Sequence, residues 1–221
     1  FYVANWRFIF TNTSYADLFA SPSPVQHFWT LSIEEQFYLL FPILLVGSLW
    51  LGRKRWGAVA GMVGALTVLA VGWMIFLADR ATPIDRLYFS TVTRLPELTI
   101  GILLAIAVAA WHPADRAWSR RLAQVVGLVA LAFFLVLSFT VHRDAPWIYH
   151  GGLAAYAAVI SCGLVVGAMM PGGPVRRILG CWPLRQLGIL SYTVYLFHWP
   201  IFLVLDETRT QLVCAFGVEE G

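Results

Sequence analysis

Charged residues are scarce in this sequence. Only 12% of its 221 residues are charged, 59% are hydrophobic, and the mean hydropathy is +0.73. Soluble domains carry about 25% charged residues, so this composition excludes an ordinary water-soluble protein. The net charge of only +3, scattered between apolar blocks, argues against a nucleic-acid partner.

Patterns that hold metals or disulfides are also missing. The three cysteines are dispersed and form no Cys-x-x-Cys pair, which excludes a disulfide framework and a zinc site of the usual spacing. No two histidines have the His-x-x-x-His spacing, and there is no phosphate-binding loop. We therefore predict no metal and no tightly bound cofactor.

Long apolar blocks are what the sequence does have. Several approach or exceed the roughly 20 residues that cross a bilayer, and hydrocarbon forces such segments to be helical. We predict an all-α integral membrane protein in which six helices form a bundle. The predicted spans are 37–51, 57–78, 95–111, 122–141, 147–170 and 187–205.

The distribution of basic residues predicts the orientation of these spans. The loops after the first, third and fifth spans hold nine Lys or Arg and a single acid, Asp115. Because basic loops stay in the cytoplasm, we expect these three loops inside and residues 1–36 outside. Residues 37–205 are then the membrane domain. Residues 206–221 are expected to be a tail or a truncation, and the chain starts without Met, so we expect sequence upstream.

Two Gly-x-x-x-Gly patterns lie within the predicted spans. They begin at Gly57 and at Gly163 and end at Gly61 and Gly167. Small residues at this spacing let the backbones of two membrane helices approach each other closely. We therefore predict tight helix packing at both patterns.

The most informative stretch runs from His27 to Tyr38 and reads HFWTLSIEEQFY. One interpretation is structural, because Ser32 and Glu35 have the spacing of a capping box at a helix start. The other is functional. Neighbouring helix positions point about 100° apart, so only one of Glu34 and Glu35 can face the bundle, where it would accept a proton from a hydroxyl.

A second candidate site lies at the predicted start of the third span. Arg94 and Glu97 are three residues apart and could simply form an ion pair on one helix face. Alternatively, Arg94 binds an anionic substrate group or a developing oxyanion through its fork of donors. The sequence leaves both interpretations open.

A third candidate is His198, which is embedded in the last apolar block. Tyr195 lies one turn before it, and Pro200 follows, where we expect a kink. A lone histidine among aromatic residues can be purely structural. However, Glu34, Arg94, Glu97 and His198 all map to the outer half of the membrane, which predicts a shared cleft.

Residues 27–40 closely resemble the Trp-Ser-Leu-x-x-Glu-Glu-Gln-Phe-Tyr hallmark of acyltransferase family three, with Thr30 in place of the more usual Ser. The stretches 94–105 and 187–201 resemble two further segments of these multi-pass membrane O-acyltransferases. The resemblance implies a partial chain of a roughly ten-helix domain. It also implies a catalytic histidine on a helix that would precede Phe1, so we expect this part of the protein to lack a key general base and to be inactive by itself.

The same resemblance implies transfer of an acyl group, commonly acetyl from acyl-CoA, to a carbohydrate or lipid-linked glycan. On this basis Glu34, Glu35 and His198 are catalytic candidates. The substrate-binding candidates are Trp29, Arg94, Glu97 and Tyr195. Direct transfer and a covalent acyl-enzyme are both compatible with the sequence, since it has no recognisable nucleophile motif.

Two other functions compete with this prediction. A transporter or flippase of a glycan or acyl carrier would use the same polar groups for binding alone. A structural or interaction subunit with degenerate sites is the further alternative.

Overall fold

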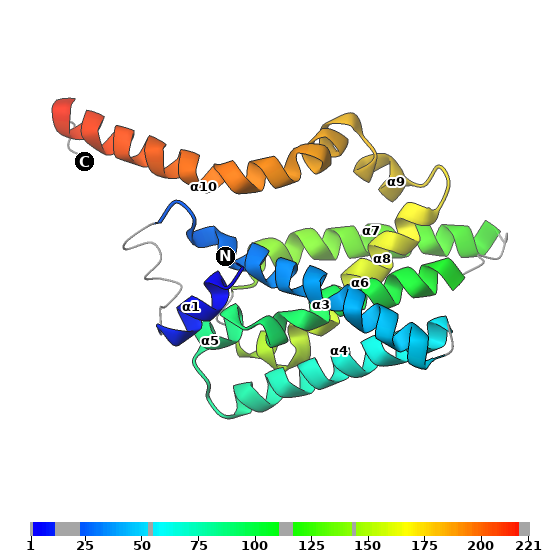
Figure 1. The fold of residues 1–221 in the computed structure, drawn as a ribbon. Coiled ribbons are helices and arrows are strands. Elements are labelled where there is room, and N and C mark those ends of the chain that lie inside the picture. The colour runs from blue at the N-terminus through cyan, green and yellow to red at the C-terminus, as the bar shows by residue number, and fades with distance from the viewer. Residues whose placement is uncertain (1, 12–22, 53–54, 111–116, 143–144, 217–221) are drawn as a thin grey trace.

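A computed structural model describes residues 2–11, 23–52, 55–110, 117–142 and 145–216 (Figure 1). Throughout these ranges the regular structure is helical. The elements are α1 (Ala4–Phe10), η1 (Gln26–Phe28), α3 (Trp29–Leu51), α4 (Trp56–Asp79), α5 (Ile84–Phe89), α6 (Thr91–Ala110), α7 (Ala117–Thr140), η2 (Ile148–Gly152), α8 (Leu153–Met169), α9 (Pro174–Leu179) and α10 (Trp182–Phe216).

Six of these helical segments are long and apolar enough to cross a membrane, which confirms the predicted number. They span Gln26–Leu51, Trp56–Asp79, Thr91–Ala110, Ser119–Thr140, Ile148–Met169 and Trp182–Leu205. The prediction of an all-α integral membrane bundle is therefore confirmed. The short helices α1, α5 and α9 lie between or before these segments.

Five long helices, α3, α4, α6, α7 and α8, form one bundle, while α10 runs along one side of it (Figure 1). Within the bundle α4 packs against α6 and α7 packs against α8. The apolar window of α10 has no buried residue. Figure 1 also shows α10 changing direction near its middle, where Pro200 lies inside the helix, in agreement with the predicted kink.

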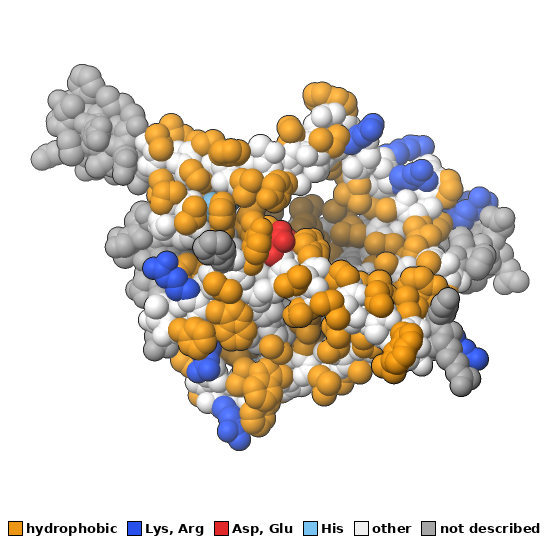
Figure 2. All heavy atoms as spheres, viewed as in Figure 1, with side chains coloured by type: hydrophobic (Ala, Val, Ile, Leu, Met, Phe, Trp, Pro, Cys, Tyr) orange, Lys and Arg blue, Asp and Glu red, His pale blue; other side chains and the backbone are white. Residues whose placement is uncertain are grey.

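The face of the molecule that Figure 2 shows is largely apolar along the sides of the helices. Large side chains such as Phe139, Trp50 and Leu51 are each at least three-quarters exposed, at 86%, 79% and 76%. Water would penalise such a surface, whereas lipid tails would not. The exposed apolar belt is therefore what a multi-pass membrane protein requires.

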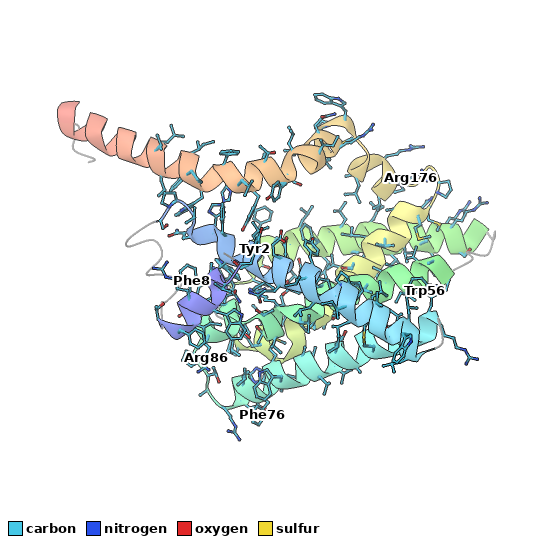
Figure 3. The ribbon with its side chains drawn as sticks, in the orientation of Figure 1. Tyr2, Phe8, Trp56, Phe76, Arg86 and Arg176 are labelled. Carbon is cyan, nitrogen blue, oxygen red and sulfur yellow. The ribbon has the colours of Figure 1, made fainter. Side chains whose placement is uncertain are left out.

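The two ends of the bundle carry the polar connections. Figure 3 shows Trp56 and Arg176 at one end, and Tyr2, Phe8, Phe76 and Arg86 at the other. This separation matches the predicted alternation of loops along the chain. Which end faces the cytoplasm stays a prediction.

Several predicted span boundaries were wrong. The helix α3 begins at Trp29 rather than at residue 37, α6 begins at Thr91 rather than at 95, and α10 extends from Trp182 to Phe216. Polar residues lower the local hydropathy but do not end the helix, because their side chains contact neighbouring elements or line a pocket. The carboxylates of the hallmark stretch therefore lie within the second turn of α3.

The early start of α3 also overturns the capping-box interpretation. Phe28 is the N-cap residue, no side chain caps this end, and the first turn contains no acid. Ser32 is buried inside the helix, where its hydroxyl accepts from Ala4 N–H at 3.3 Å and donates to Phe28 O at 3.0 Å. Ser32 thus links α1 to α3 by a hydrogen bond.

Of the two Gly-x-x-x-Gly patterns, only the second marks tight packing. A Cβ on Gly163 would lie 2.3 Å from the Cβ of Ala130, and one on Gly167 would lie 2.8 Å from the Cα of Gly127. Nothing lies within 4 Å of the corresponding positions on Gly57 and Gly61. The pattern identifies small residues, but only the partner helix decides whether they are needed.

We expect Gly163→Ala to destabilise the α7–α8 interface by about 1–3 kcal/mol, because the added methyl group overlaps Ala130. The measurement is the thermal unfolding temperature in detergent. Gly61→Ala, in the other Gly-x-x-x-Gly pattern, is the matched control and should melt like the wild type. Equal melting of all three proteins would contradict the close α7–α8 packing.

Candidate active site

A small pocket lies between the first turns of α3 and the α5–α6 region. Its volume is about 230 Å³, and it combines aromatic, apolar and ionisable side chains. Figure 2 shows acidic side chains at the edge of a hollow between α10 and the bundle. The pocket lining consists of Trp29, Thr30, Ile33, Glu34, Tyr88, Arg94, Glu97 and Leu98.

Arg94 is fixed on one wall of this pocket by three contacts. Its Nη1 lies 2.9 Å from Glu97 Oε1, and its Nε donates to Tyr88 O at 3.3 Å. The guanidinium carbon also lies 4.6 Å from the centre of the Tyr88 ring. The ion pair and the pocket position therefore coexist, so the two interpretations of Arg94 and Glu97 are not exclusive.

The two hallmark glutamates face different ways, as the helix geometry predicts. Glu34 lines the pocket and is exposed, and within the described residues its carboxylate has no hydrogen bond or ion pair. Glu35 is half-buried and does not line the pocket. Of the two acids, only Glu34 lines the pocket together with Arg94.

Trp29 is a largely buried part of the pocket lining. It is only 6% exposed, and its ring centre lies 4.9 Å from that of Tyr88 and 5.1 Å from that of Phe89. Together with Ile33 it belongs to a buried cluster that joins α3 to α5. The hallmark tryptophan thus supports the pocket as well as lining it.

Tyr195 connects α10 to the start of α3. Its hydroxyl donates to His27 O at 2.5 Å and also contacts the hydroxyl of Thr30. A second bond, from Trp199 Nε1 to Ser23 O at 3.0 Å, lies nearby. Because Thr30 lines the pocket, Tyr195 reaches the pocket wall from behind rather than its interior.

His198 does not line the pocket, but its ring is held in a defined orientation. Nδ1 lies 2.8 Å from Tyr195 O. A carbonyl oxygen only accepts hydrogen bonds, so Nδ1 carries the hydrogen, and in the neutral ring Nε2 keeps the lone pair. The predicted convergence therefore holds for Glu34, Arg94 and Glu97, whereas His198 is adjacent through Tyr195 and Thr30.

Sequence reasoning assigned no role to His27, Thr30 or Tyr88. The ring of His27 lies 5.0 Å from that of His198 and 5.2 Å from that of Tyr195. Both its ring nitrogens are buried without a hydrogen-bond partner among the described residues. Its place directly before the hallmark was the only available signal. Tyr88 offered none, because its contact with Arg94 depends on the bend between α5 and α6.

Comparisons with known proteins identify a family and several relatives. A family described as an acyltransferase domain matches residues 1–211. The chain is 34% identical over 222 residues to the "Peptidoglycan O-acetyltransferase OatA" of Listeria monocytogenes, covering 96% of this chain and 35% of that protein.

Two further relatives come from other bacteria. The "Putative peptidoglycan O-acetyltransferase YrhL" of Bacillus subtilis is 32% identical over 211 residues, covering 92% of this chain and 32% of that protein. The "O-acetyltransferase OatA" of Staphylococcus aureus is 31% identical over 218 residues, covering 96% and 35%.

The chain spans about a third of the length of these curated relatives. No solved structure matches it. The family match nevertheless covers all six candidate spans and every residue of the pocket. The chain therefore belongs to the acyltransferase family that this domain defines.

Proposed function

We propose that the protein transfers an acyl group, in the simplest case acetyl, to a hydroxyl of peptidoglycan or a related envelope glycan. The observation that carries this proposal is the pocket that Glu34, Arg94 and Glu97 share in a member of an acyltransferase family. The names of the relatives, which are peptidoglycan O-acetyltransferases, support the choice of acceptor.

The donor we propose is an acyl-CoA thioester, as the family resemblance implies. A thioester carbonyl is already activated towards attack. The protein must therefore mainly remove the proton of the acceptor hydroxyl, stabilise the oxyanion and exclude water. In the pocket, the carboxylate of Glu34 is placed to remove the proton, and the guanidinium of Arg94 is placed to stabilise the oxyanion.

In the proposed reaction the acceptor oxygen attacks the carbonyl carbon, and its proton passes to the carboxylate of Glu34. The negative charge that forms on the carbonyl oxygen is stabilised by Arg94, which Glu97 and Tyr88 O hold in place. Collapse of this intermediate breaks the carbon–sulfur bond, and the leaving thiolate takes the proton from Glu34.

Aromatic and α10 residues complete the proposed site. Trp29 and Tyr88 line the pocket with aromatic ring atoms, which C–H groups of a sugar can contact. Tyr195 keeps α10 at the pocket wall, and His198 presents the lone pair of Nε2 to a ligand hydroxyl beside it. Acceptor, donor and bilayer are then the partners of the protein.

Mass spectrometry of envelope glycans tests this function. Cells with the intact gene, with a deletion and with Glu34→Gln are compared before and after mild alkali, which removes O-acyl esters. We expect the base-labile acyl group to be lost in both mutants. A transporter would instead change the amount of acceptor on one membrane face while the ester content stayed the same, and that result would overturn the proposal.

A further inference from the structure

A hydrogen-bonded cluster of side chains lies beside the pocket but does not line it. It consists of Asn5 on α1, Gln36 on α3 and Thr91 on α6. Asn5 is fully buried, at 0% exposure, and its Nδ2 donates to Thr91 Oγ1 at 2.9 Å and to Phe89 O at 3.1 Å.

Gln36 closes this cluster with four hydrogen bonds. Its Nε2 donates to Asn5 Oδ1 at 3.1 Å and to Tyr2 O at 2.7 Å. Its Oε1 accepts from Thr91 Oγ1 at 2.8 Å and from Trp6 Nε1 at 3.4 Å. Every polar hydrogen and the oxygen of this amide are used, so the hallmark glutamine has no capacity left for a substrate.

The cluster is hydrogen-bonded to the chain at the break between helices α5 and α6. Phe89 ends α5, Ser90 adopts an extended conformation with φ −71° and ψ 130°, and Thr91 begins α6. The two anchored groups, Phe89 O and Thr91 Oγ1, therefore lie on either side of the break. Two helices that are far from this bend in the sequence, α1 and α3, therefore hold it.

The same break is what brings Arg94 to the pocket. Tyr88 lies just before it and Arg94 just after it, and these two residues contact each other through Arg94 Nε and Tyr88 O at 3.3 Å. A change in the bend would move the guanidinium relative to Glu34 on α3. Because a displacement of about 1 Å at a reacting group can cost about 10²-fold in rate, the bend matters for catalysis.

We infer that Asn5, Gln36 and Thr91 are positioning residues, which hold the α5–α6 break so that Arg94 faces Glu34 across the pocket. This inference rests on the proposed function, since it assigns these residues a role in the same transfer reaction. Asn5 is the central member, because it alone bonds to both sides of the break.

The test is a double-mutant cycle in the whole protein. Thr91→Val removes the hydroxyl that joins Asn5 to Gln36, whereas Thr91→Ser keeps it. Incorporation of base-labile acetate into envelope glycan, divided by the amount of protein in the membrane, is measured. We expect Thr91→Val to lower this rate roughly 10- to 100-fold and Thr91→Ser to recover most of it.

The decisive comparison uses Arg94→Lys as a second background. If Thr91 acts through Arg94, adding Thr91→Val to Arg94→Lys should lower the rate by less than about twofold further. If Thr91→Val lowered the rate by the same factor in the Arg94→Lys background as in the wild type, the inference would be overturned, and Thr91 would have only a structural role. Thr67→Val is the matched control, because it breaks a different interhelical hydrogen bond to α6, Thr67 Oγ1 to Thr99 Oγ1 at 2.8 Å, between two residues that do not line the pocket.

Failure of the inference is distinguishable from failure of the proposed function. A wild-type protein that adds no base-labile acetate overturns the function itself, and full activity of Arg94→Lys overturns both the role of Arg94 and the inference. If Thr91→Val does not accumulate in the membrane, Gln36→Glu replaces it, because this change removes the two N–H donors to Asn5 Oδ1 and Tyr2 O.

Discussion

Replacing Glu34 by Gln is expected to reduce acyl transfer by about 10²- to 10⁴-fold while the amount of protein in the membrane stays normal. Gln has nearly the same shape as Glu but does not take up a proton at neutral pH. Glu34 is exposed in the pocket and holds no other described residue through a hydrogen bond, so the fold does not depend on its charge. The measurement is the base-labile acetate content of envelope glycan.

Glu35→Gln is the matched control for this prediction. It removes the same charge from the neighbouring position of the same helix, but Glu35 does not line the pocket. Its effect on transfer should be much smaller than that of Glu34→Gln. If the two variants lost activity equally, the catalytic acid would not be identified by its position in the pocket, and Glu34 would lose its assigned role.

The second large effect is expected for Arg94→Lys, which should lower the transfer rate by about 10²- to 10³-fold. Lysine keeps the positive charge but has a single ammonium group in place of a planar fork of donors. Its three N–H donors sit on one nitrogen, so it does not reproduce the separate contacts of Arg94 Nε with Tyr88 O and Nη1 with Glu97 Oε1 that leave further donors for an oxyanion.

The rate at saturating donor concentration separates this effect from a loss of binding. A role in stabilising the oxyanion lowers that rate, whereas a role only in binding the donor raises the concentration needed and leaves the rate unchanged. Arg86→Lys is the control, because Arg86 is exposed on the neighbouring helix α5 and does not line the pocket. Wild-type kinetics for Arg94→Lys would contradict the proposed mechanism.

The division of labour within the hallmark stretch follows from the geometry. Trp29 and Ser32 pack or fasten neighbouring elements, and Gln36 is saturated by four hydrogen bonds. Thr30 and Glu34 line the pocket. Thr30 and Glu34 thus contribute to the pocket, Ser32 and Gln36 hold α1 and the α5–α6 break around it, and Trp29 does both.

Local patterns in the sequence were sufficient for the membrane class and the number of spans, and they gave the Arg94–Glu97 ion pair as one of two interpretations. Hydropathy is a property of a continuous segment, and an i, i+3 pair needs only one helix, so neither depends on the rest of the fold. The 100° step between adjacent helix positions also predicted correctly that Glu34 and Glu35 face apart.

Only the tertiary structure decided which glutamate enters the pocket, that Gly163 rather than Gly61 is tightly packed, and that Tyr88 supports Arg94. It also revealed Asn5, which lies 84 residues before the carbonyl it binds. Each of these features depends on contacts between helices far apart in the sequence. Such contacts depend on how the helices pack and on the bend between α5 and α6, and no local pattern of residues encodes either.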